Sequence, residues 1–148
     1  MCKKKIESCF LNIVFPLLAG FIFYYLFCPD VIAIEKIDTI LKIKYHVQIS
    51  NTNLIIRFMR FYLLDALWAY ALTHCLFVIL GNTLVALKES VAISIIMSFT
   101  MELLQLFHAV AGTFDIYDIA VETVAVFIAS IIIIQHLKGE KENEKQST

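Results

Sequence analysis

Four long apolar segments constrain the fold of this chain more than any other feature of its sequence. An α-helix needs about 20 largely apolar residues to cross the hydrocarbon core of a bilayer. The segments that meet this requirement run from about residue 9 to 28, 62 to 80, 91 to 107 and 116 to 134. The chain is 60% hydrophobic, whereas a soluble domain has about 45–50% apolar residues. The sequence therefore predicts an all-α membrane protein, a bundle of four transmembrane helices that forms one domain over residues 1–137.

The first connection is long, and the tail is charged. Residues 41–50 alternate strictly between apolar and polar side chains. A period of two is typical of a strand with one apolar face, so we expect a short extended or amphipathic segment in the loop of residues 29–61. Residues 51–53 have the composition of a turn and a helix N-cap. Residues 138–148 are charged and lack aromatic residues, and they are predicted to be disordered.

The distribution of basic residues predicts the orientation. The first segment is preceded by three lysines and lacks a small-residue cleavage site, so we expect a retained helix rather than a signal peptide. With both termini in the cytoplasm, seven of the 12 Lys and Arg residues lie inside and five outside. This is the direction of the positive-inside rule. The sequence thus predicts a multi-pass plasma-membrane protein with cytoplasmic N- and C-termini.

Charge and motif content disfavour several functions. A net charge of −1 offers no basic surface for nucleic acid. The sequence has no Gly-rich phosphate loop, no His-rich metal motif and no Ser or Cys beside a base, so no cofactor and no metal site are expected. His108 lies near several acids, but without the spacing of a zinc site. The four cysteines form no Cys-x-x-Cys pair, and no disulfide framework is expected.

Ionisable residues inside membrane segments mark the candidate site, because each costs about 2.5–3.5 kcal/mol on insertion scales. The start of the second segment, the end of the third and the start of the fourth lie on one side of the membrane in either orientation. The candidate ligand-binding residues that these ends bring together are Arg57, Arg60, Asp65, Glu102, Gln105, Asp115, Asp118 and Glu122.

The positions of Glu102 and Glu122 predict a shared pocket. With a rise of 1.5 Å per residue, Glu102 lies roughly 8 Å inside the end of the third segment, and Glu122 roughly 9 Å inside the start of the fourth. We therefore expect the two carboxylates to face each other at matching depth. The result would be an acidic pocket that opens to the outer interface, with Arg57 or Arg60 as the counter-charge of the shallower acids.

Several of these residues also fit a purely structural role. Asp115 or Asp118 is equally suited to cap the N-terminus of the fourth segment, where the helix dipole favours an anion. Gln105 is suited to bind the backbone of a neighbouring helix. The step from Ala125 to Ala129 predicts close helix packing, either inside the chain or in a homo-oligomer. The aromatic residues that fit an interfacial belt are Tyr24, Tyr25, Tyr62, Trp68 and Tyr117.

The acidic stretch resembles a known family. The residues Glu102-Leu-Leu-Gln105 close one span, and Asp115 and Asp118 follow a short loop. This arrangement resembles the VanZ-like family of small bacterial membrane proteins, and the strong part of the resemblance covers residues 102–129. The family pattern has Glu-x-x-Gln, then Arg-x-x-Asp-x-x-Asp, an Asn four residues later and glycines beyond. Asp65 also lies where the family has an Asp-led helix start.

The chain departs from this pattern at four positions, where the family arginine, asparagine and two glycines are replaced by Gly112, Glu122, Ala125 and Ala129. The resemblance implies a cell-envelope protein of a bacterium, linked to tolerance of teicoplanin-type glycopeptides. It also implies a membrane lipid or lipid-linked envelope component as the partner. The site residues that it carries over are Glu102, Gln105, Asp115 and Asp118, with Glu122 as a local variant.

Several functions remain open at this point. The preferred hypothesis is a non-enzymatic membrane protein that binds an amphiphilic or lipid-linked ligand. A proton- or ion-coupled transporter would use the buried carboxylates as a relay. A membrane-embedded hydrolase would use Glu102 and Glu122 as an acid–base pair. The fourth hypothesis is that the protein acts as a scaffold for a partner membrane protein.

Overall fold

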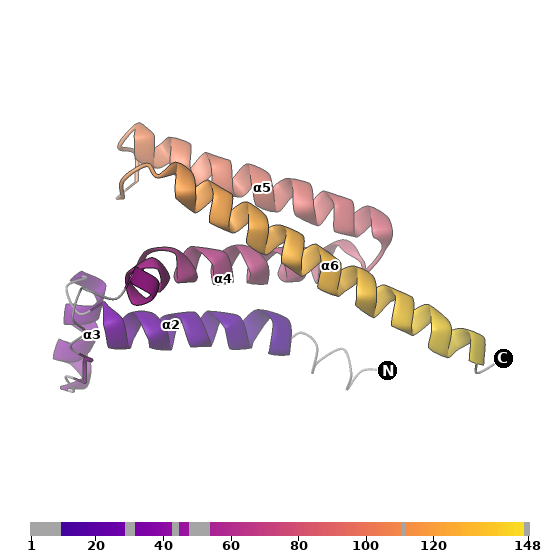
Figure 1. Ribbon diagram of the computed structural model, residues 1–148, viewed down its shortest axis with the longest axis horizontal. Coiled ribbons are helices and arrows are strands. Elements are labelled where there is room, and N and C mark those ends of the chain that lie inside the picture. Colours follow the sequence, from indigo (N-terminus) through magenta and orange to yellow (C-terminus); the bar gives the residue numbers. More distant parts are fainter. Residues whose placement is uncertain (1–9, 29–31, 43–44, 48–53, 111, 147–148) are drawn as a thin grey trace.

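The computed structural model describes residues 10–28, 32–42, 45–47, 54–110 and 112–146. In this part of the chain every regular element is a helix (Figure 1): η1 Phe10–Val14, α2 Phe15–Phe27, α3 Ile32–Leu41, α4 Leu54–Leu80, α5 Leu84–Leu106 and α6 Ile116–Gln146. Four helical stretches are long and apolar enough to cross a membrane: Phe10–Phe27, Arg57–Leu80, Leu84–Leu106 and Ile116–Gly139. The predicted all-α bundle with four spans is confirmed.

Helix α4 is the centre of the bundle. Figure 1 shows α2, α4, α5 and α6 side by side along the molecule, and α2, α5 and α6 each pack against α4. A glycine allows the close approach of α2, since a Cβ atom added at Gly20 would lie 3.1 Å from Leu64 Cδ1 and 3.2 Å from Leu67 Cδ1. At the other end of this helix pair, the Tyr70 hydroxyl donates to Asn12 Oδ1 at 2.7 Å.

The first span begins with a π-helical turn, η1, before α2. Pro16 lies in the first turn of α2, which continues η1 without a break. Because proline has no N–H group, it cannot donate the α-helical hydrogen bond to the carbonyl of Asn12, and the turn before it is π-helical. The sequence placed the start of this span at about residue 9, which lies outside the described residues.

Helix α5 begins at Leu84, earlier than the predicted start at Val91. The turn before it is short because Gly81 and Asn82 adopt positive φ angles of 116° and 56°. Thr83 then caps the helix, since its hydroxyl accepts a hydrogen bond from the amide of Ala86 at 3.1 Å. Residues 88 and 89, which we expected in a connection, are exposed residues of the helix.

Helix α6 is longer than its predicted span and continues to Gln146. Residues 138–146 are therefore helical, in contrast to the predicted disorder, and residues 147–148 lie outside the described part of the chain. Lys, Glu and Gln have high helix propensity. They also extend a helix that the membrane segment has already nucleated, and extension is far more favourable than nucleation.

The first connection contains a helix instead of a strand. Helix α3 runs across the C-terminal end of α2 (Figure 1). Leu41, the first residue of the predicted strand, ends α3, and residues 45–47 have no regular structure. The strand prediction is wrong for these residues, while residues 43–44 and 48–53 lie outside the described part. A lone strand has no partner for its backbone groups, whereas a helix satisfies its own. Helix α3 is itself amphipathic, with Ile34 and Asp38 buried and Glu35 and Lys36 exposed, but it precedes the residues whose alternation suggested such a segment.

Small residues pack the helices together in the middle of the bundle. Ala69 of α4 forms a buried cluster with Ala125 and Val126 of α6, and Ala129 is also fully buried. The face that contains Ala125 and Ala129 is thus occupied within the chain, and it is not exposed for a second copy. A second cluster closes the end of the bundle opposite α3 and consists of Phe77, Ala86, Leu87 and Ile133.

Candidate functional site

Four carboxylates from three helices meet inside the bundle, at the end where α4 and α6 begin. They are Asp65 of α4, Glu102 of α5, and Asp118 and Glu122 of α6, and we call them the acidic cluster. Each lies within electrostatic range of the other three. Glu102 and Glu122 are only 4% and 6% exposed. The structure therefore brings together the deep acids that the sequence placed at one end of the molecule.

Asp115 connects the three helices that surround the acidic cluster. One carboxylate oxygen, Oδ1, accepts a hydrogen bond from the amide of Tyr117 at 2.9 Å, which caps the N-terminus of α6. The other, Oδ2, accepts from the Tyr62 hydroxyl at 3.2 Å. The amide of Asp115 donates to Glu102 Oε2 at 2.9 Å. The capping alternative is confirmed for Asp115, and Glu102 also has a structural partner.

Gln105 supports the turn between α5 and α6. Gly112 has a φ angle of 141°, and a Cβ atom at this position would lie 2.7 Å from the side-chain Cδ of Gln105. The observed turn therefore requires glycine at position 112. The arginine of the VanZ-like pattern would fit there only if Gln105 moved and the backbone changed conformation.

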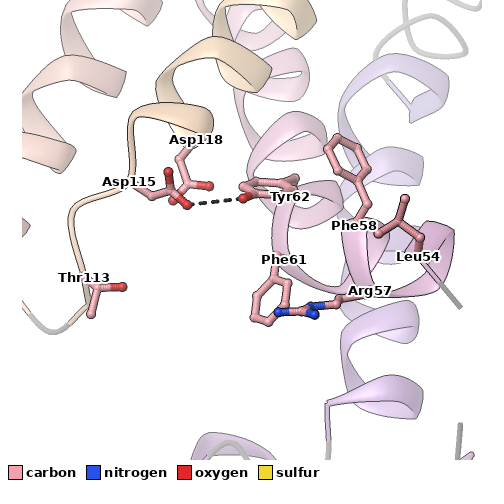
Figure 2. A pocket seen from close by; sticks show the side chains of 8 residues that line it. All are labelled: Leu54, Arg57, Phe58, Phe61, Tyr62, Thr113, Asp115 and Asp118. Carbon is pink, nitrogen blue, oxygen red and sulfur yellow. Dashed lines mark hydrogen bonds between the residues drawn. The ribbon is translucent and has the colours of Figure 1, made fainter. Parts of the chain in front are cut away.

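A cavity lies beside the acidic cluster, between the start of α4 and the start of α6. Its volume is about 670 Å³, and its lining residues are Leu54, Arg57, Phe58, Phe61, Tyr62, Thr113, Asp115 and Asp118. Figure 2 shows the carboxylates of Asp115 and Asp118 on the side of Tyr62, with Arg57 beside Phe61. One wall is therefore acidic, and the other is aromatic and apolar with one arginine at its edge.

The predicted single pocket is divided in the structure. Arg57, Asp115 and Asp118 line the cavity, whereas Asp65, Glu102, Gln105 and Glu122 are not among its lining residues. Arg60 also lies outside this lining and instead acts electrostatically on Tyr24, as does Asp65. Only Asp118 belongs both to the cavity wall and to the acidic cluster. It therefore forms the connection between the cavity and the bundle interior.

A column of polar residues continues from the acidic cluster into the bundle. Ser90, Ser94, Ser98 and Glu102 follow each other at four-residue intervals on one face of α5, and their exposure is 0, 0, 1 and 4%. On α4, Thr73 Oγ1 lies 3.0 Å from Ser94 Oγ. We call this set, together with Thr73, the polar column. Sequence reasoning missed it, although serines at four-residue intervals that lead to Glu102 were a readable pattern.

Two buried atoms lack a partner where the column meets the acidic cluster. Ser98 lies beside Glu122, but neither Ser98 Oγ nor Glu122 Oε2 forms a hydrogen bond of standard geometry with any described residue. Buried polar atoms in proteins are nearly always hydrogen-bonded. Ser98 is nevertheless close enough to Glu122 for a side-chain hydrogen bond to influence that carboxylate, so the two residues form the contact between the polar column and the acidic cluster.

A second polar cluster joins α3 to the end of α2. His46 Nε2 lies 2.6 Å from Asp38 Oδ2, and His46 Nδ1 lies 3.0 Å from the carbonyl oxygen of Tyr25. The Tyr25 hydroxyl donates to Asp38 Oδ1 at 2.9 Å. We call these three residues the α3 clamp. The sequence indicated it only through Asp38, an acid at a helical position that continues the apolar face of Ile34 and Ile37.

No group of three or more His, Cys, Asp or Glu side chains among the described residues is arranged to hold a metal ion. Comparison with known proteins finds no family model, no curated protein and no solved structure that matches this chain. The resemblance to the VanZ-like family stays a prediction that rests on the residues named above.

Proposed function

We propose that this protein binds an amphiphilic or lipid-linked molecule of the bacterial cell envelope in the cavity between α4 and α6. The observation that carries the proposal is the division of the cavity into an acidic wall and an aromatic wall. A volume of about 670 Å³ lies within the usual range for ligand sites, about 300–1,000 Å³. The cavity lies at the ends of helices that are long and apolar enough to span a membrane, which supports a location near one membrane surface.

The two walls favour an amphiphile with a cationic group. Phe58 and Phe61 are more than half exposed, and they provide a surface for acyl or ring groups. Asp115 is already bound to Tyr62 and Tyr117. Asp118 is therefore the carboxylate best placed to accept a hydrogen bond from an amine, since its side chain forms none with another described residue. Arg57 at the edge would contact an anionic group, such as a phosphate, on the same molecule.

The proposed biological role follows from the resemblance and from this chemistry. Teicoplanin-type glycopeptides are envelope-directed amphiphiles, and a protein that binds such molecules or their lipid-linked targets would protect the cell. The charge bias of the chain supports an orientation with the cavity on the outer side of the plasma membrane. The protein would therefore meet the ligand where such compounds reach the membrane.

A binding measurement with Asp118→Asn tests the proposal. The purified protein in nanodiscs would be titrated with a fluorescent cationic amphiphile. A charge-assisted hydrogen bond contributes about 1.5–3 kcal/mol, so we expect the affinity to fall by about 10-fold to 100-fold. Glu89→Gln is the matched control, because it removes an exposed acid from α5 at the other end of the bundle. Equal affinities of wild type and Asp118→Asn would contradict the proposal.

Growth in the presence of teicoplanin-type glycopeptides tests the biological role separately. Cells would express wild type or Asp118→Asn at matched membrane levels. We expect wild type to protect and the variant to lose most of the protection. Protection that is identical in both would exclude the acidic wall as its cause.

A further inference from the structure

We infer that the interior of the bundle conducts protons, along a path that begins at the acidic cluster and continues through the polar column to Ser90. This activity is separate from the binding of an amphiphile in the cavity. It uses carboxylates and hydroxyl groups that do not line the cavity, apart from Asp118 at the entrance.

The length of the polar column is a large fraction of the thickness of a bilayer. Ser90 and Glu102 are twelve residues apart, which corresponds to about 18 Å along a helix. The hydrocarbon core of a bilayer is about 30 Å thick, so the column covers more than half of it. Every side chain of the column on α5 is buried. The polar groups are therefore shielded from lipid, and they line the inside of the bundle.

The spacing of the column suits transfer through water. Successive side chains at four-residue intervals are separated by about 6 Å along the helix, which is too far for a direct hydrogen bond. One water molecule bridges a gap of this size. Thr73 adds a hydroxyl 3.0 Å from Ser94 Oγ, midway along the column. Conduction along the column therefore requires water molecules between its hydroxyl groups, and it requires the hydroxyls of Thr73 and Ser90 to turn away from the carbonyl oxygens of Ala69 and Ala86, to which they donate in the structure.

The charge of the cluster explains why protons are the species bound. The charged groups that act on Asp65 are Glu122 and Glu102, and those that act on Glu122 are Glu102 and Asp118. On the adjoining faces, Arg60 acts on Tyr24 and Arg57 lines the cavity. Like charges in a low-dielectric interior repel strongly. Proton uptake relieves this repulsion, and the described acids are not arranged to hold a metal ion.

Glu122 and Ser98 form the junction of the path. A proton that enters past Asp118 converts the Glu122 carboxylate into a carboxylic acid. The new O–H group of Glu122 can then donate to the unpartnered Ser98 Oγ. When the proton passes to a water molecule in the column, the carboxylate is restored. This cycle consumes no other reactant.

An apolar barrier closes the far end of the column. One helical turn beyond Ser90, the side chains of Ala86 and Leu87 pack against Phe77 and Ile133. Water cannot be stabilised among these groups, so the barrier limits the rate of conduction. A polar side chain in place of Leu87 should therefore increase the flux.

The test is a measurement of proton flux in proteoliposomes that contain the full chain and a pH-sensitive dye, with valinomycin and potassium to clamp the potential. We expect Leu87→Ser to raise the flux several-fold above wild type. We expect Glu122→Gln to reduce the flux of both wild type and Leu87→Ser by about 10-fold or more. The control is Glu89→Gln, an exposed acid of α5 outside the path, which should leave the flux unchanged.

Two outcomes would overturn the inference. The first is a flux no higher than that of protein-free liposomes in both wild type and Leu87→Ser. The second is an undiminished flux in Glu122→Gln when this variant elutes as a folded protein in size-exclusion chromatography. Binding of the cationic amphiphile to Glu122→Gln would be measured in parallel and should match wild type. Failure of the proton path and failure of ligand binding are therefore distinguishable.

Discussion

Two buried polar clusters lie at the same end of the molecule and are built in opposite ways. The α3 clamp combines an acid, a base and a phenol, and its members are joined by contacts of 2.6, 2.9 and 3.0 Å. The acidic cluster consists only of carboxylates, and Glu122 Oε2 lacks a hydrogen-bond partner among the described residues. The hydrogen bonds of the α3 clamp therefore favour a role in stability, whereas the mutual repulsion of the carboxylates makes the acidic cluster the candidate for a function.

The two clusters also differ in how their hydrogen bonds are satisfied. The carbonyl oxygen of Tyr25 can only accept, so His46 Nδ1 must donate to it. The contact between His46 Nε2 and Asp38 then requires a second proton, which the histidine and the acid share. The α3 clamp thus holds all the protons that its hydrogen bonds need. In the acidic cluster, by contrast, Ser98 Oγ and Glu122 Oε2 lie beside each other but form no hydrogen bond of standard geometry with any described residue.

The largest effect is expected from breaking the α3 clamp. Asp38→Ala leaves His46 and the Tyr25 hydroxyl without their acceptor, and loss of one member of a buried charged pair costs about 3–5 kcal/mol. Circular dichroism would monitor the unfolding of the protein in detergent, and the loss would appear as a lower free energy of unfolding. Glu35→Ala on the exposed side of α3 is the control and should change it by less than about 0.5 kcal/mol. Equal stability of the two variants would refute the structural role of the clamp.

A change in pH is expected to have a smaller effect on the stability of the α3 clamp. When His46 loses its shared proton, the neutral imidazole has one N–H group and cannot donate to both Tyr25 and Asp38. The two hydrogen bonds of His46 therefore depend on this proton, and loss of the proton as the pH rises should weaken the clamp. Hydrogen exchange of the α3 amides should accelerate more with rising pH than base catalysis alone explains. In His46→Phe this excess should disappear, and its persistence would show that another group is responsible.

The smallest expected effect is an increase in the free energy of unfolding, and it distinguishes the two clusters most directly. Glu122→Gln removes a buried carboxylate that is surrounded by other acids, and substitutions that relieve such sites commonly stabilise a protein by about 1 kcal/mol. The isosteric change in the α3 clamp, Asp38→Asn, should destabilise it instead. The same unfolding assay measures both variants. If Glu122→Gln proved as destabilising as Asp38→Asn, the acidic cluster would have to be regarded as structural.

Part of the site could be predicted from the sequence because its residues follow local rules. The helix ends that hold Asp115 and Glu102 belong to consecutive spans, and so they must meet at one side of the membrane. The N-cap role of Asp115 also depends only on its position before α6. In the same way, spacing along a helix was sufficient to place Glu122 at the depth of Glu102, and the two lie within electrostatic range.

Other parts depended on contacts that no local pattern contains. The partners of His46 lie 8 and 21 residues away in the sequence. Alternation over residues 41–50 predicted a strand, whereas Leu41 ends α3 and residues 45–47 have no regular structure. The requirement for glycine at position 112 arises from its φ angle of 141°, and the Gln105 side chain seven residues earlier further limits the space there.

The sequence by itself determined that the chain crosses the membrane four times and that its acids gather at one end. The length of each apolar segment can be read directly from the sequence. The order of the spans then decides which helix ends lie on the same side of the membrane. Only the tertiary structure decided how each helix is rotated about its axis. That rotation separates Asp118, which lines the cavity, from Glu102 and Glu122 in the interior. It is decided by packing between helices, including the approach of α2 to Leu64 and Leu67 at Gly20, and no single segment contains that information.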